Sequence, residues 1–169
     1  MRKQLLTILA MLLIVSSVKA GEGDIFLNGS IGLAYRNTAS AVLSVEWENS
    51  YYHSWMVYVD FATNYAWCET DQTYLCNKTF WDYKTLGIGG AFKPELYRWK
   101  NLNLKGGLGV DLGIKEGYSF FLSIDLMFEL SYSFKNRTQI FVQQKNDFCF
   151  WCKEHFRNGA MIGIKIPLN

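Results

Sequence analysis

The sequence predicts an all-β fold: an eight-stranded antiparallel up-and-down outer-membrane β-barrel at residues 21–169, after a cleaved N-terminal signal peptide at residues 1–20. Three observations support this prediction. Residues 122–132 alternate between two kinds of side chain along their whole length. Half of the chain is hydrophobic and 19% is charged, although no segment after the signal has the pattern of a helical membrane span. The chain also begins with a secretory signal.

Residues 122–132 show the strand pattern most clearly. Successive side chains of a strand point to opposite sides, so a period of two indicates a strand and not a helix. Strands of soluble proteins usually end after about 5–6 residues. A tilted strand of this length, at roughly 3.3 Å per residue, reaches across a bilayer core. Because an open sheet edge cannot face lipid, the other strands must close a barrel with it. The side chains expected to face lipid are Leu122, Ile124, Leu126, Phe128, Leu130 and Tyr132.

The first twenty residues have the features of a signal peptide. Arg2 and Lys3 precede an apolar run over residues 5–15, and Val18 and Ala20 fit cleavage after Ala20. The run is shorter than the ~20 residues that a membrane-spanning helix needs. Without the signal, the chain has 14 basic and 15 acidic residues and a net charge of −1. This balance does not favour a nucleic-acid surface, so no direct nucleic-acid binding is expected.

Seven further segments alternate in the same way, and we expect each to be a strand. Segment 79–92 is the least regular, because Asp82 and Lys84 share the parity of Leu86; we place both charges above the bilayer or beyond a β-bulge. Residues 93–101 are expected to form a turn region, because Pro94 cannot sit in a paired central strand. The seven segments are residues 24–36, 39–48, 54–65, 79–92, 102–112, 137–146 and 155–168.

Aromatic residues gather near the predicted strand ends, where the aromatic girdles of membrane barrels lie. With both termini in the periplasm, the loops after the first, third, fifth and seventh strands face outward. The aromatic residues expected at the periplasmic rim are Trp47, Tyr51, Tyr52, Trp55, Tyr97 and Trp99. Those expected at the outer rim are Tyr65, Trp67, Trp81, Tyr118, Phe120 and Trp151.

The four cysteines, Cys68, Cys76, Cys149 and Cys152, fall in two predicted outer loops, 67–78 and 147–154. In an exported chain they most simply form disulfides, and three pairings are possible. A redox-active Cys-x-x-Cys pair at 149–152 lacks the helix N-terminus that would stabilise a thiolate. A four-cysteine zinc site is a second alternative. We expect loop disulfides, with no metal and no cofactor.

The charged residues predicted to face the interior are of mixed sign. This mixture indicates a paired network that fills a small barrel and not an ion-selective ring. Eight strands enclose an interior just wide enough for side chains, so a wide pore is not expected. The predicted interior network consists of Arg36, Glu46, Asp60, Lys105, Asp111, Asp125, Glu129, Lys145, Arg157 and Lys165.

The pattern does not favour an enzyme. An outer-membrane hydrolase or acyltransferase would need a nucleophile beside a base near one rim. His53 and His155, the latter next to Glu154, are the candidate bases, but no serine in an elbow-like setting adjoins either. We therefore expect a non-enzymatic protein without catalytic residues.

Five segments of the second half of the chain carry a family resemblance: residues 87–92, 106–109, 126–132, 136–137 and 159–166. In these segments the chain resembles the TraO conjugal transfer proteins of Bacteroidetes mobile elements. The resemblance covers roughly residues 84–168 and rests on spaced glycine, glutamate and lysine positions. It implies an outer-membrane component of a conjugative, type IV-like DNA-transfer apparatus, without catalytic residues, and it implies that Glu129 and Lys165 are interior positions. The four cysteines depart from the family pattern.

We therefore expect a barrel of the cell outer membrane that contacts lipid and other proteins of a conjugation apparatus, and the resemblance implies that a conjugative transposon encodes it. Two alternatives remain open. One is a generic small outer-membrane barrel of the porin family that serves surface adhesion or envelope integrity. The other is a secreted soluble binding barrel like the lipocalins, whose apolar faces would line a cavity instead of meeting lipid.

Overall fold

The computed structural model describes residues 23–34, 38–64, 84–115, 119–150 and 156–168. The expected signal peptide lies outside these residues. The described strands are β1 (Asp24–Ala34), β2 (Thr38–Glu48), β3 (Ser54–Asn64), β4 (Lys84–Lys93), β5 (Glu95–Trp99), β6 (Leu102–Lys115), β7 (Ser119–Ser133), β8 (Gln139–Phe150) and β9 (Phe156–Pro167). No described helix is long and apolar enough to span a membrane.

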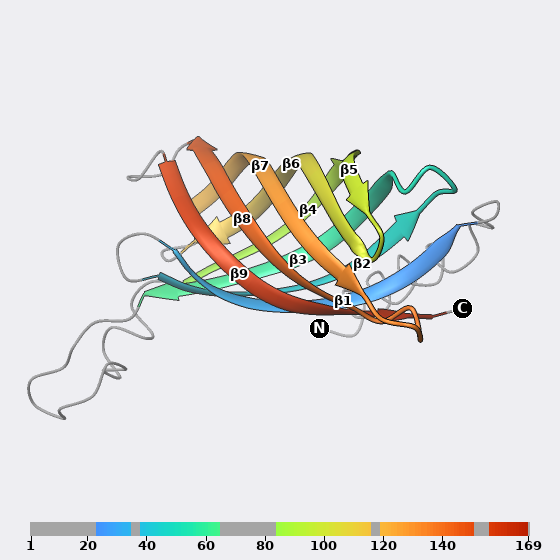
Figure 1. Ribbon diagram of the computed structural model, residues 1–169. Helices are drawn as coiled ribbons and strands as arrows, with labels where there is room; N and C mark the ends of the chain where they lie inside the picture. The colour runs from blue at the N-terminus through green and yellow to red at the C-terminus, as the bar shows by residue number, and fades with distance from the viewer. Residues whose placement is uncertain (1–22, 35–37, 65–83, 116–118, 151–155, 169) are drawn as a thin grey trace, which may run out of the picture.

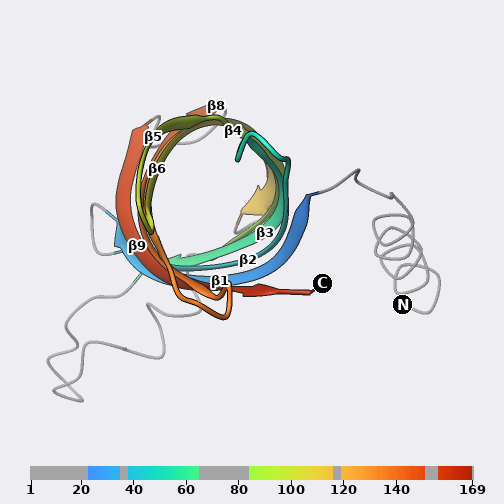
Figure 2. The same cartoon turned by 45° about the vertical axis from the view of Figure 1, so that its right-hand side comes forward.

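The strands close into one antiparallel barrel. Each strand pairs with its sequence neighbour except β4 and β5, which do not pair with each other; β1 also pairs with β9, and β4 pairs with β6. Strands β4 and β5 pair with successive parts of the same neighbour, β6. They therefore occupy one strand position in the wall, and the barrel has eight strand positions. The strands slope around the axis (Figure 1), and the view in Figure 2 shows the closed ring. This confirms the predicted eight-stranded barrel.

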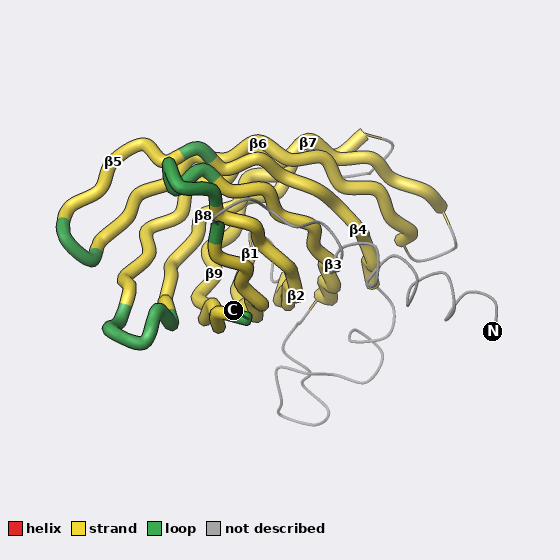
Figure 3. The backbone as a smooth tube through the Cα atoms, turned by 90° about the vertical axis from the view of Figure 1, so that its right-hand side faces the viewer, coloured by secondary structure: helices red, strands yellow, loops and turns green. Residues whose placement is uncertain are grey.

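The two ends of the barrel differ. The short connections β2–β3, β5–β6 and β7–β8 lie at one end, which we call the turn end; Figure 3 shows described turns in green. Tyr52, Lys100 and Arg137 in these connections have φ values of 61°, 52° and 65°. This left-handed backbone is uncommon outside glycine and is typical of tight turns. Strand β1 starts at the turn end and ends at the opposite end, which we call the loop end.

The prediction of a turn region at residues 93–101 is wrong for most of these residues, because they lie in strands. Strand β4 continues to Lys93, and β5 resumes pairing with β6 at Glu95. Pro94 has no N–H to donate, but its carbonyl oxygen still accepts a 3.1 Å bond from the Gly106 amide nitrogen. Pro94 therefore separates β4 from β5 and removes one ladder bond, while the pairing with β6 continues on both sides of it.

Several strands run further toward the loop end than expected. Strand β6 reaches Lys115, three residues beyond its predicted end, and β8 reaches Phe150 although residues 147–154 were expected to be a loop. In both strands the alternation continues into the added residues, so the barrel wall continues with it. Asp82, which we expected above the bilayer or beyond a β-bulge, lies outside the described residues. Lys84 is the first residue of β4.

The barrel has its apolar side chains outside and its charges inside. Val110, Leu126 and Ile164 are 50%, 38% and 43% exposed, while Asp125 and Lys165 are 0% exposed. This arrangement confirms the predicted faces. It excludes the lipocalin-like alternative, because such a barrel would turn its apolar rows inward.

Exposed aromatic side chains lie near both ends of the barrel wall. At the turn end, the expected Tyr51, Tyr52, Trp55, Tyr97 and Trp99 are all exposed, whereas Trp47 is half-buried. Of the aromatic residues expected at the loop end, only Phe120 is among the described residues, and it is 76% exposed. These positions match the interface girdles of membrane barrels.

The outward rows lead to a direct test. Leu126→Arg should prevent stable membrane assembly, because a cation on the lipid face near mid-bilayer costs roughly 2–4 kcal/mol. Leu126→Met, which keeps an apolar side chain of similar volume, is the matched control. Assembly can be measured as the fraction of protein that migrates as folded barrel on unheated gels of membrane extracts. Normal assembly of the arginine variant would contradict the outward placement of this row.

Candidate functional site inside the barrel

The interior charges lie in two groups separated along the barrel axis. We call the first the turn-end network; it consists of Glu46, Glu48, Lys93, Lys105, Glu129 and Lys165. We call the second the loop-end network; it consists of Asp60, Asp111, Asp125, Lys145, Asp147 and Arg157. Each group draws its side chains from several strands, so the contacts depend on how the closed barrel sets the register.

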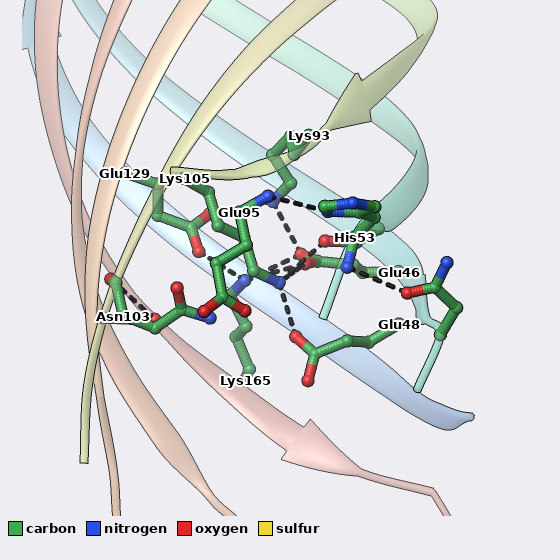
Figure 4. A network of polar contacts seen from close by, with 12 residues as sticks. Glu46, Glu48, His53, Lys93, Glu95, Asn103, Lys105, Glu129 and Lys165 are labelled. Atoms are coloured by element: carbon green, nitrogen blue, oxygen red, sulfur yellow. Dashed lines mark hydrogen bonds and ion pairs between the residues drawn. The ribbon is translucent and has the colours of Figure 1, made fainter. Parts of the chain in front are cut away.

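The turn-end network is centred on the Glu46 carboxylate. The ammonium nitrogens of Lys93, Lys105 and Lys165 lie 2.6, 3.0 and 2.8 Å from its oxygens. Glu129 binds two of the same lysines, Lys93 at 2.8 Å and Lys165 at 2.5 Å. Figure 4 shows these groups converging from different strands. One carboxylate thus holds three cations, and a second carboxylate shares two of them.

The remaining contacts of the turn-end network balance its positive and negative charges. Lys105 Nζ also lies 2.5 Å from Glu48 Oε2 and donates to Ser54 Oγ at 2.7 Å, while Asn28 Nδ2 donates to Glu46 at 3.0 Å. Three lysines therefore face three glutamates. Burying an ion is tolerable only when partners replace the lost water, and here each lysine meets at least two carboxylates.

The loop-end network is centred on Lys145. Its Nζ lies 2.7 Å from Asp60 Oδ2, 3.4 Å from Asp147 Oδ1 and 3.5 Å from Asp125 Oδ2. The Asp125 carboxylate also accepts hydrogen bonds from the Tyr58 hydroxyl and from Ser123 Oγ. Arg157 adds a second cation 3.5 Å from Asp147.

Asp111 differs from the other carboxylates of the loop-end network. It is 1% exposed, and neither of its carboxylate oxygens has a hydrogen-bond partner among the described residues. The carboxylate lies against Gly87 of β4, where a Cβ would come within 2.4 Å of Oδ1. Four aspartates face Lys145 and Arg157 here, so the described part of this network has more acidic than basic groups.

An apolar layer fills the barrel between the two networks. Met56, Tyr58, Ala91 and Met127 pack together, and each is at most 5% exposed. Nearby interior cavities measure about 20 and 10 Å³, comparable with the space of a single water molecule. The described strands therefore enclose a packed interior and not an open channel.

Glycines make room for the aromatic side chains inside this narrow barrel. Tyr58 and Gly89 are cross-strand partners, and a Cβ on Gly89 would lie 2.3 Å from the Tyr58 ring. Phe141 stands in the same way over its partner Gly163. A glycine on one strand thus accommodates a large ring from the next, which explains part of the glycine spacing in the sequence.

Nine of the ten residues predicted for the interior lie on inward rows. Arg36 lies outside the described residues, and Arg157 is half-buried while the others are buried. Sequence reasoning missed three network members: Lys93, Glu48 and Asp147. Lys93 and Asp147 were assigned to connections, although each keeps the inward parity of its strand. Glu48 had the correct parity but was left out of the network.

The other candidate site residues are only partly described. Cys149 lies on the inward row of β8 and is buried. Cys68, Cys76 and Cys152 lie outside the described residues, so the predicted disulfide pairing stays a prediction. His53 Nδ1 accepts a 3.0 Å hydrogen bond from the Glu95 amide nitrogen, and His155 is not described. Among the described residues, no three His, Cys, Asp or Glu side chains are grouped so as to hold a metal ion.

The turn-end network predicts a large effect of a small change. Glu129→Gln should lower the free energy of unfolding by about 3 kcal/mol, because it leaves Lys93 and Lys165 with less buried negative charge. The double variant Glu129→Gln with Lys165→Met should lose less than the sum of the two single variants, since both partners of the 2.5 Å pair are gone. Urea unfolding in lipid vesicles measures all four proteins. Additive losses would show that the two residues do not interact.

The packed interior makes a prediction about transport. In planar bilayers the purified barrel should produce no stable conductance steps, because the apolar layer and both networks leave only water-sized cavities. Reproducible steps from protein of verified purity would show that the interior opens.

Comparisons with known proteins show the fold and no family. No family model matches the chain, and no curated protein matches it. Among solved structures, the chain is similar to Neisserial surface protein A, with a TM-score of 0.60 and 12% identity; the match covers 85% of this chain and 96% of that one.

The chain is also similar to a de novo designed transmembrane β-barrel, with a TM-score of 0.52 and 13% identity; the match covers 88% of this chain and 98% of that one. The outer-membrane enzyme PagL matches with a TM-score of 0.50, 12% identity and coverages of 85% and 99%. The fold of this chain is therefore that of outer-membrane β-barrels, and its outward apolar rows need a bilayer around them.

Proposed function

We propose that this outer-membrane barrel is a non-enzymatic component of a conjugative DNA-transfer apparatus and acts by docking partner proteins. The resemblance of residues 84–168 to TraO proteins motivates the conjugation role. The two charged positions carried by that resemblance, Glu129 and Lys165, form a 2.5 Å ion pair inside the barrel. Positions that matter for the resemblance are thus also positions that hold this interior together.

The packed interior is the observation that carries the docking role. The buried lysines and glutamates of the turn-end network bind one another and do not line a substrate-sized cavity. The described interior also offers no path for a strand of DNA, which supports a role at the surface. Partner proteins would then meet the barrel at its ends or along its wall.

The turn end offers exposed side chains suited to such contacts. Tyr51 and Trp99 are 75% and 58% exposed. Arg98 stacks on Tyr52, with its guanidinium carbon 3.2 Å from the ring centroid. Aromatic residues and arginine are the side chains that contribute most to protein interfaces. With both termini in the periplasm, this end would face periplasmic parts of the apparatus.

A mating experiment tests the proposed function. Deleting the coding sequence from a donor cell should reduce transfer of the element to the level of a donor without a mating apparatus, and the intact gene supplied in trans should restore it. Donor growth and detergent sensitivity are measured in parallel. Unchanged transfer together with a leaky envelope would contradict the conjugation role and favour the alternative of envelope integrity.

A further inference from the structure

The lipid-facing surface has one polar interruption. Apart from the cross-strand pair Thr63 and Lys84 at the loop ends of β3 and β4, the only polar residues on the outward rows of the described strands are three amides. The amides are Gln144 on β8, which is exposed, Asn146 on β8, which is buried at 8% exposure, and Asn158 on β9, which is half-buried. Gln144 and Asn146 lie in the middle of their strand, since the outward row of β8 reads Ile140, Val142, Gln144, Asn146, Phe148 and Phe150.

The three amides partly satisfy one another. Asn158 Nδ2 donates to Asn146 Oδ1 at 2.5 Å, and Asn146 Nδ2 donates to the Leu126 carbonyl oxygen at 3.3 Å. Gln144 Nε2 reaches the same Asn146 oxygen at 3.5 Å, the limit of a hydrogen bond. Gln144 itself is exposed, and among the described residues nothing donates to its Oε1. Its amide is therefore the least satisfied of the three.

An exposed amide in this position needs a partner that lipid tails cannot provide. Gln144 is the cross-strand partner of Phe128 and Ala160, both on the outward apolar rows. Polar groups in hydrocarbon are costly unless they are hydrogen-bonded. Because two apolar outward positions separate the amide pair from each end of β8, headgroups are remote from Gln144, and a membrane-embedded protein is the better partner.

A shallow apolar groove begins beside the amides. It crosses the outer faces of β9, β1 and β2 in two adjoining hollows of about 650 and 690 Å³. The small residues Gly29, Ala41 and Ala160 line it, and Ile31 and Ile162, which line both hollows, are 67% and 61% exposed. Strands β8, β9 and β1 lie side by side in Figure 1. Small residues on a lipid-facing surface permit the close approach of another membrane protein.

We propose that the outer faces of β8, β9 and β1 form a homodimer interface within the bilayer, in which the Gln144 amides of two copies hydrogen-bond to each other. An amide is both donor and acceptor, so the same side chain can pair with itself across a twofold axis. The described outward rows of these strands carry no formal charge between the rims, so two identical faces do not repel each other. The exposed Ile162 of one copy can then enter the groove of the other.

Energy transfer in vesicles tests the dimer. Wild-type protein labelled at its amino terminus with donor or acceptor dye is reconstituted into phosphatidylcholine vesicles over a range of protein-to-lipid ratios. The wild type should follow a monomer–dimer curve above the random-proximity level. Gln144→Leu should weaken the dimer about tenfold, through loss of two symmetric hydrogen bonds.

Two more variants separate the interface from the fold. Ala160→Phe fills the groove next to Gln144 and should also weaken the dimer, whereas Val110→Leu on β6, away from this face, should leave it unchanged. Gel mobility of unheated samples verifies folding, and Gln144→Leu completes an apolar row and should fold normally. Energy transfer of the wild type at the random-proximity level would overturn the proposal. Equal dimerisation of the wild type and Gln144→Leu would also overturn it. A monomeric wild type whose Gln144 amide NMR signal shifts on addition of lipopolysaccharide would overturn it in favour of a lipid site.

Discussion

The pairing of buried lysines with buried carboxylates is the interaction on which the rest of this barrel depends. A barrel that turns its apolar residues toward lipid must place its polar residues in a narrow interior with little room for water. The Glu46 carboxylate meets this demand by contacting Lys93, Lys105 and Lys165, which come from three different strands. These contacts connect opposite parts of the wall, so the network joins strands that share no backbone hydrogen bonds.

The filled interior also determines where this protein can act. With two charge networks and an apolar layer across the described barrel, the surfaces left for function are the two ends and the outer wall. The uneven outer wall is informative in this respect. Most of it is an ordinary apolar belt, but the amides near Gln144 and the adjacent groove lined by Ala160 concentrate polarity and small side chains on one side. A single lipid solvent around the barrel gives no reason for such asymmetry, whereas a protein partner does.

Much of the fold could be predicted from the sequence because strand alternation is a local property. The period of two along residues 122–132 assigned every side chain of that strand to its correct face. Lys93 was missed because a neighbouring proline was interpreted as the end of the strand, while the structure shows that Pro94 removes only one ladder bond. The contacts within the networks could not be predicted, because they depend on the register around the closed barrel. The amide of Gln144 was overlooked since a single polar position in an apolar row is a weak signal without its cross-strand neighbours.

The central claim is that apolar side chains face lipid while the interior is packed away from it. NMR of the wild-type barrel in nanodiscs tests this most directly, by magnetisation transfer from lipid acyl-chain protons to protein methyl groups. The methyl groups of Val110, Leu126 and Ile164 should receive strong transfer, and those of the buried Met56, Met127 and Met161 should receive none. Strong transfer to Met127, or contact of the Leu126 methyl groups with bulk water, would contradict the account.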